Sequence, residues 1–208
     1  MTITAENLCK RFNREWIFRD FNYHFQTGTY AITGPNGSGK STLLQVLWGQ
    51  VPATSGTMLL SEAGVQVAEE DLFKHVSIAA PYVELMEELT LEEAIRFHFS
   101  FKKVRKEIGQ DSLLDRMELT HARGKQVGHF SSGMKQRLKL GLALFSDVGA
   151  VFLDEPTTNL DTPSIAWYWR NFEQIEGKAC IFIASNHQEE YPATAIKVHL
   201  PDYKGGYK

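Results

Sequence analysis

The chain has 208 residues, of which 43% are hydrophobic and 23% charged, and its formal net charge is −3. This composition excludes a disordered or fibrous chain and leaves room for one well-packed domain, not for two full domains in series. No apolar run approaches the length of about eighteen residues that a membrane span needs, and no dense Lys/Arg block indicates a nucleic-acid surface, so we expect a cytoplasmic chain without a nucleic-acid partner.

The N-terminal part of the chain predicts β-strands. The runs 1–10 and 16–25 are rich in β-branched and aromatic residues, and the end of the second run alternates aromatic and polar side chains. We therefore expect an antiparallel β element ahead of the strand-like run 29–33. Cys9 and Cys180 both lie in strand-like runs far apart in the sequence, which predicts buried thiols, not a disulfide or a metal pair.

A glycine-rich stretch follows the run 29–33. Residues 34–42 read GPNGSGKST and match the phosphate-loop pattern G-x-x-x-x-G-K-[ST], and an apolar helical run, 40–48, comes next. The glycines let backbone N–H groups turn toward phosphate oxygens, and the helix adds its positive N-terminal end. Lys40 is expected at the β- and γ-phosphates and Ser41 at Mg²⁺. The residues expected to bind the nucleoside triphosphate are Gly34, Pro35, Asn36, Gly37, Ser38, Gly39, Lys40, Ser41 and Thr42.

The middle of the chain changes from turn and strand to helix. Residues 52–56 predict a turn, and 75–80 a strand. The sequence Thr-Leu-Glu-Glu at 90–93 is a capping box that begins a helical pattern. Helices are expected to dominate up to residue 146, so we predict a helical subdomain at 81–146 inserted into the core.

From residue 150 strands and helices alternate. The runs 150–153, 179–184 and 196–200 predict buried strands, and Thr162 with Pro163 predicts the start of a helix. Buried strands that alternate with helices imply a parallel sheet. We expect an α/β protein with a P-loop core.

Two acids follow the strand at 150–153. In a P-loop enzyme such acids lie at the carboxyl edge of the sheet, beside the phosphates. Asp154 would hold Mg²⁺, directly or through water, and Glu155 is the candidate base that polarises the attacking water. The alternative is a solvated acidic pair at a strand end.

Four further stretches make the pattern more specific. They are PTTNLD at 156–161, FSSGMKQR at 130–137, IASNH at 183–187 and, near the N-terminus, Phe12 in NLCKRF. In this order the chain resembles the ATP-binding subunit of an ABC transporter, over nearly its whole length. The resemblance implies a single ATP-binding domain over 1–208, with a RecA-like P-loop NTPase core, an N-terminal antiparallel β subdomain and an inserted helical subdomain.

The resemblance also implies a composite nucleotide site. The family carries L-S-G-G-Q-x-x-R where this chain has residues 130–137, so Ser131 and Gly133 would meet a γ-phosphate at a helix N-terminus. Because this signature does not reach the phosphate loop of its own chain in the family's fold, a two-fold dimer with ATP between the subunits is implied. Asp161 would act across that dimer. The alternatives are that Ser131 caps its helix and that Asp161 begins the next one.

Two more roles come from the same resemblance. His187 would hydrogen-bond the γ-phosphate and orient the water, although a single histidine after a strand is more often structural. Phe12 is in register to stack on adenine. Core packing is the alternative for Phe12, and Trp16 is a second candidate for the adenine.

The chain departs from the family's pattern at one functional position. The family places a glutamine after the strand at 75–80, but Pro81 stands there, so water or Glu84 would complete the magnesium shell. The signature carries Ser132 and Met134 in place of glycine and glutamine, and the serine retains a hydroxyl and an N–H for phosphate.

The function implied is that of an ATPase, with ATP and Mg²⁺ as cofactors, on the inner face of the cell membrane. Its sandwich dimer would drive transport through a separate integral membrane subunit. The form of the signature favours export. The segment from Pro81 is the expected docking surface, with Tyr82, Leu85 and Met86 as contacts, or else these residues belong to the subdomain core. A soluble ABC-type ATPase, in iron–sulfur assembly or DNA repair, is the second hypothesis. A small-molecule or nucleotide kinase is the third, and it leaves the signature and His187 unexplained.

Overall fold

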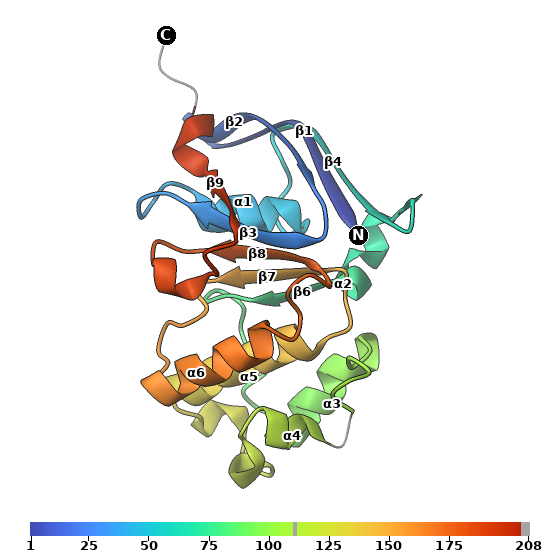
Figure 1. The fold of residues 1–208 in the computed structure, drawn as a ribbon, viewed down its shortest axis with the longest axis vertical. Coiled ribbons are helices and arrows are strands. Elements are labelled where there is room, and N and C mark those ends of the chain that lie inside the picture. Colours follow the sequence, from blue (N-terminus) through green and yellow to red (C-terminus); the bar gives the residue numbers. More distant parts are fainter. Residues whose placement is uncertain (110–111, 205–208) are drawn as a thin grey trace.

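The chain forms two β-sheets with helices between and beside them (Figure 1). The structure is a computed structural model that describes residues 1–109 and 112–204. The helices and strands are, in chain order, β1 (Thr2–Phe12), β2 (Glu15–Phe25), β3 (Gly28–Thr33), α1 (Lys40–Leu47), β4 (Ser55–Glu62), β5 (Val65–Gln66), α2 (Leu72–His75), β6 (Val76–Ala79), α3 (Leu91–Phe101), α4 (Leu113–Arg116), α5 (Ser132–Phe145), β7 (Ala150–Asp154), α6 (Thr162–Phe172), β8 (Cys180–Ala184) and β9 (Ile196–His199).

The antiparallel sheet has the order β2-β1-β4-β5. Phe21 and Phe25 of β2 are fully buried, whereas Asn22 and His24 between them are exposed, as the alternation in the sequence predicts. The expected N-terminal antiparallel element is therefore confirmed. Cys9 is a buried free thiol in β1, and Cys180 is another at the start of β8.

The sequence does not predict the hairpin of β4 and β5. The turn expected at 52–56 is wrong for residues 55 and 56, which belong to β4. β4 already begins at Ser55 and pairs with β1. The reason lies at Gly56, which has a φ of +87° and lies so close to β1 that a Cβ atom would stand 2.3 Å from the carbonyl oxygen of Asn7. The glycine serves a close approach of two strands, not a turn.

The parallel sheet has the order β6-β7-β8-β3-β9. Neighbouring strands pair in register, with Ala79 opposite Leu153 and Asp154 opposite Ala184. The carboxyl ends of β3, β6, β7 and β8 consequently meet at one edge, where the phosphate loop, the strand acids and the segment of His187 follow them. The parallel sheet and the α/β fold class are as expected.

Each face of the parallel sheet has its own hydrophobic core. In β7, Ala150 and Phe152 join the core shared with α1 and the antiparallel sheet, and Val151 and Leu153 join the core beneath α5 and α6. In Figure 1, α1 lies between the two sheets, and α5 and α6 cover the opposite face. The core around α1 therefore packs against the element that carries the phosphate loop.

The segment 81–146 contains α3, α4 and α5, joined by short 3₁₀ turns. The capping box at the start of α3 forms as expected, with the Glu93 carboxylate accepting from the Thr90 N–H at 2.9 Å. Buried residues of α3, α4 and α5 share one core with the parallel sheet. The division of this segment from the core stays a prediction. Among the described residues, no helix is long and apolar enough to cross a membrane.

Candidate functional site

The phosphate loop has the conformation that its glycines allow. Gly39, the residue before α1, has a φ of +100°, and a Cβ atom there would lie 2.1 Å from Cγ2 of Ile17. At Gly34 a Cβ atom would lie 2.8 Å from Ser38 Oγ and 2.9 Å from Cδ of Pro201. Ile17 of β2 and Pro201, which follows β9, therefore lie against the loop and leave no room for side chains at these glycines.

Lys40 lies buried at the start of α1 and faces the strand acids. Its ammonium donates to the carbonyl oxygens of Gly34, at 2.9 Å, and Pro35, at 3.3 Å. Burial lowers the pKa of Lys40, and the charges of Asp154 and Glu155 oppose that change. The loop thus contains a cation whose hydrogen bonds go to carbonyl groups of the loop, and a phosphate can replace these carbonyl groups as the acceptor.

Asp154 ends β7 and is only 3% exposed. Burial raises the pKa of this carboxyl to about 6, with a further upward contribution from Glu155, while the hydroxyl of Ser41, the charge of Lys40 and the hydroxyl of Tyr82 act in the opposite direction. At pH 7 the group is a buried anion beside a hydroxyl, a pair of hard oxygen donors.

These donors fit Mg²⁺ with a nucleotide. In a protein Mg²⁺ commonly takes one or two such oxygens, together with phosphate oxygens and waters. Within residues 1–109 and 112–204, no three His, Cys, Asp or Glu side chains gather in a metal-binding group. Ser38 Oγ of the loop is buried and has no hydrogen-bond partner in the described part of the chain, which leaves a polar atom for a ligand to satisfy.

Replacing Asp154 by asparagine is expected to stabilise the nucleotide-free chain by about 3 kcal/mol at pH 7, because folding raises the pKa of this carboxyl from 3.8 to about 6. The unfavourable contribution of the Asp154 carboxyl to folding is absent at low pH, where the group is protonated in the folded and the unfolded state. It grows as the pH rises toward 6 and is constant above that. Urea unfolding at pH 7 and at about pH 4.5 checks this, with a gain of about 1 kcal/mol expected at the lower pH. An equal gain in stability at both pH values would contradict a raised pKa of Asp154.

Glu155 follows Asp154 in a conformation that is unusual for a residue other than glycine. Its φ is +46°, its N–H donates to the carbonyl oxygen of Ala184 at 2.9 Å, and its carboxylate is exposed. A backbone of this kind costs about 1–3 kcal/mol and is typical of functional sites. The bend sends the Glu155 side chain away from the buried pocket of Asp154, into solvent at the same sheet edge.

His187 stands beyond the end of β8, at the same edge. Its N–H donates to the buried hydroxyl of Ser185 at 2.8 Å, and its side chain is exposed. The side chain of Asn186 donates to that of Asn36 in the phosphate loop. The structure thus brings the histidine segment and the phosphate loop together.

Ser131 and Gly133 lie at the N-terminus of α5. Ser131 is the helix cap, and its hydroxyl accepts from the N–H of Met134 at 3.2 Å. A Cβ atom at Gly133 would lie 3.1 Å from the carbonyl oxygen of Asn159. A cavity of about 370 Å³ is lined by these residues and by Asp161, but by none of 34–42. The structure groups the signature with Asp161, apart from the phosphate loop.

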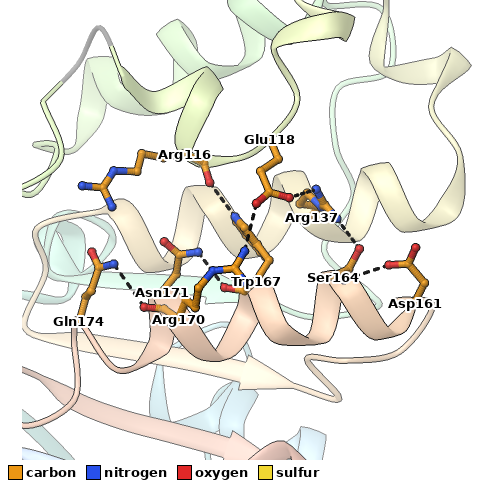
Figure 2. A network of polar contacts seen from close by, with 9 residues as sticks. All are labelled: Arg116, Glu118, Arg137, Asp161, Ser164, Trp167, Arg170, Asn171 and Gln174. Atoms are coloured by element: carbon orange, nitrogen blue, oxygen red, sulfur yellow. Dashed lines mark hydrogen bonds and ion pairs between the residues drawn. The ribbon is translucent and has the colours of Figure 1, made fainter.

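Asp161 caps α6, since its carboxylate accepts from the N–H of Ser164 at 3.0 Å. The Ser164 hydroxyl and, to a smaller extent, this N–H lower the pKa of the carboxyl. Figure 2 shows the contacts behind the cap. Arg137 of α5 donates to Glu118 at 2.8 Å and to the hydroxyl of Ser164, and Arg170 donates to Glu118 at 3.1 Å. The arginine of the signature therefore ties α5 to α6 and does not point to the phosphate loop.

Two buried polar side chains that sequence reasoning missed hold the loop 156–161. The Gln136 amide donates to the carbonyl oxygen of Pro156 at 2.8 Å, and the Glu190 carboxylate accepts from the N–H of Thr157 at 2.9 Å. They fix the loop to the signature helix on one side and to the segment of His187 on the other. Gln136 falls at a position that the signature pattern leaves open, and no motif contains Glu190.

The two candidates for the adenine have different surroundings. Phe12 is 48% exposed, which excludes a core position, and the ammonium of Lys10 lies 4.7 Å from its ring centroid. The guanidinium carbons of Arg11 and Arg19 lie 5.3 and 4.8 Å from the Trp16 ring centroid. Both rings thus have cationic partners, so these contacts do not distinguish them.

Comparisons with known proteins agree with this geometry. The family model described as ABC transporter matches residues 18–158. The lantibiotic transport ATP-binding protein SrtF of Streptococcus pyogenes is 31% identical, over 98% of this chain and 85% of the relative. Among solved structures, an ATP-binding subunit of an ABC transporter matches with a TM-score of 0.82 and 23% identity, over 96% of this chain and 87% of the other. A dimeric, post-hydrolysis state of an ATP-binding cassette bound to ADP and Pi matches with a TM-score of 0.74 and 18% identity, over 89% and 88%.

Proposed function

The chain belongs to the ABC transporter family of ATP-binding proteins, and we propose that it hydrolyses ATP as a sandwich dimer that drives export through a separate membrane subunit. The observation that carries the proposal is the meeting of Lys40, Ser41, Asp154 and Glu155 at one edge of the parallel sheet. The cation, the hard oxygen donors and an exposed carboxylate are the groups that phosphoryl transfer to water requires.

Binding would use groups that the nucleotide-free chain holds ready. Lys40 would exchange the carbonyl oxygens of Gly34 and Pro35 for phosphate oxygens, and the loop N–H groups and the N-terminus of α1 would face the same anion. Ser41 and Asp154 would hold Mg²⁺, which when bound screens the charge on the phosphates. The buried charge of Asp154, unfavourable in the free chain, would then have a cation as its partner.

Hydrolysis would use the two exposed groups at the same edge. Glu155 would accept a proton from the attacking water, and the bend in its backbone holds it apart from Asp154. His187 would orient the water and hydrogen-bond the γ-phosphate. Ser185 and Asn186 support that position, since they fix the histidine segment to its own backbone and to the phosphate loop.

The separate cavity at the N-terminus of α5 supports the dimer. Ser131, Gly133 and Asp161 line it, and the residues of the phosphate loop do not, so the nucleotide that meets it would belong to a second copy. Capping by Ser131 and Asp161 is compatible with this role, because it leaves further N–H groups of each first helical turn free. ATP between two copies would favour the closed dimer by its higher affinity for that state.

We assign the adenine to Phe12 in preference to Trp16. Side chains alternate along β2, so Ile17, which packs on the phosphate loop, points to the opposite face from Trp16. Phe12 pairs with Glu15, which shares the face of Ile17. An exposed ring on that face is available for stacking on a base.

The membrane subunit would dock at a groove beside α3. The groove has a volume of about 270 Å³ and is mostly apolar, and Phe73, Leu85, Met86 and Phe97 line it, with Lys139 at its wall. Three of these side chains are large and about half exposed, which is typical of an interaction surface. An amphipathic helix of the membrane subunit, inserting apolar side chains, fits such a groove.

Met86→Glu is expected to release the chain from membranes of the source cells, because docking would bury a carboxylate among the apolar side chains of the groove. The matched control is Val65→Glu, a substitution at an exposed apolar residue on β5, outside the groove. The measurement is the share of each variant that sediments with membranes, alongside its ATP binding in solution. Equal sedimentation of both variants would contradict docking at this groove. A native chain that hydrolyses ATP and never sediments would favour the soluble ABC-type ATPase instead.

A further inference from the structure

The segment after β6 lies beside the metal-binding edge and is fixed there. Ala79 ends β6 opposite Leu153, so the chain leaves the sheet next to Asp154. Lys139 of α5 donates to the carbonyl oxygens of Ala80, at 3.1 Å, and Pro81, at 3.3 Å. The N–H of Val83 donates to Ala80, which closes a turn. This turn connects the nucleotide edge to the groove, because Val83 already lines the groove.

Tyr82 projects from this turn into the protein. Its ring centroid lies 5.9 Å from that of Trp48, which in turn packs edge-on against Phe152 at 5.6 Å. Tyr82 is therefore not the exposed docking contact that the sequence suggested, whereas Leu85 and Met86 do line the groove. Its hydroxyl is buried and interacts with the Asp154 carboxylate, an interaction that lowers the pKa of that carboxyl, but no acceptor among the described residues lies at the distance and angle of a full hydrogen bond.

A buried hydroxyl without a partner is unfavourable, and native proteins rarely keep one without a use. Ser38 Oγ, in the phosphate loop of the same edge, is a second such atom. Among the described residues neither atom has a full hydrogen-bond partner, and both adjoin groups that would hold Mg²⁺ and phosphate. A ligand with its water shell would supply both partners.

Glu84, the substitute considered from the sequence, faces elsewhere. It is exposed and lines the groove with Lys139, whose pKa it helps to raise against the effect of burial. Pro81 has no side-chain donor or acceptor. Of the residues at this turn, Tyr82 is the one whose polar atom lies at Asp154.

We propose that Tyr82 is the positioning residue that stands in for the family's missing glutamine: its hydroxyl donates a hydrogen bond into the oxygen shell of Asp154 and Mg²⁺ when ATP is bound, and its turn links that shell to the groove. The proposal rests on the proposed function. Phosphate binding by Lys40 and the loop N–H groups does not depend on Tyr82.

The test uses the hydrolysis-deficient Glu155→Gln chain, with and without the added substitution Tyr82→Phe. Equilibrium dialysis gives the Kd of ATP with a chelator and the Kd with saturating Mg²⁺, and the first divided by the second is the metal's contribution. Tyr82→Phe is expected to reduce that ratio by about fivefold, the size of one hydrogen bond, and to leave metal-free binding unchanged. Because a phenylalanine ring keeps the packing on Trp48, the variant should fold.

Two matched variants guard the interpretation. Tyr30→Phe also removes a buried tyrosine hydroxyl, one bonded to Gln26 in the core, and Glu84→Ala removes the rival carboxylate. Neither should change the ratio. An unchanged ratio in Tyr82→Phe, or an equal loss in metal-free binding, would overturn the proposal. If the parent chain bound no ATP at all, the proposed function would fail instead.

Discussion

Glu155→Gln is expected to lower kcat for ATP hydrolysis by about 10²–10⁴-fold and to leave ATP binding intact. The amide has the size of the carboxylate but cannot accept the proton of the attacking water. Binding should survive because Glu155 is exposed and the groups that hold the phosphates lie elsewhere in the site. Phosphate release under saturating ATP measures the turnover, and equilibrium dialysis measures the binding.

The same variant makes the dimer visible, because ATP that is not hydrolysed stays between the subunits. Sedimentation velocity should show a dimer with ATP and Mg²⁺ and a monomer without them. Ser131→Arg added to this chain should abolish the dimer and preserve ATP binding, since the new side chain fills the cavity at α5 and not the phosphate loop. Full turnover by Glu155→Gln would exclude Glu155 as the base. A monomer under every condition would exclude the sandwich.

Gly39→Ala is expected to weaken ATP binding by about 10²-fold. The added methyl would stand 2.1 Å from Cγ2 of Ile17, at a φ of +100°, so the loop must move. A movement that loses two phosphate contacts of about 1.5 kcal/mol each corresponds to a loss of this size. The measurement is the Kd of ATP by equilibrium dialysis.

Gly37→Ala is the matched control for this experiment. Gly37 also has a left-handed φ, +75°, but a Cβ atom there meets nothing within 4 Å. Its effect should be limited to backbone strain of about 1 kcal/mol, or about fivefold. Ile17→Ala combined with Gly39→Ala should restore part of the binding, because it removes the clashing methyl group. Equal losses at both glycines would show that close packing against β2 is unimportant.

The parts that could be predicted from the sequence depend on residues close together in the chain. The phosphate loop is followed at once by its helix, and the capping box of α3 spans residues 90–93. The alternation in β2 and the apolar run of β7 likewise carry their own periodicity. These patterns predict the α/β fold and the acids at its edge, and the comparisons confirm the fold class.

The parts that could not be predicted depend on contacts between distant segments. Gly56 looks like a turn residue until the backbone of Asn7 is placed against it. Glu190 and Thr157, which form a hydrogen bond, are 33 positions apart. The sequence suggests that Tyr82 is a surface contact, and only the fold shows that its hydroxyl is buried beside Asp154. Local propensity carries no information on such pairs, because the fold creates them.

The position of β3 inside its sheet, between β8 and the edge strand β9, has a consequence for how the chain folds. β3 is made early, but its two neighbours, β8 and β9, come from the C-terminal part, and Thr33 meets His199 across 166 positions. Contacts of such sequence separation form slowly, and until they form β3 has two unpaired edges. Pro201 also reaches the phosphate loop only then. During synthesis on the ribosome, ATP binding would therefore appear only after β9 has emerged, and a nascent chain halted before Ile196 would have its phosphate-loop sequence but no working site.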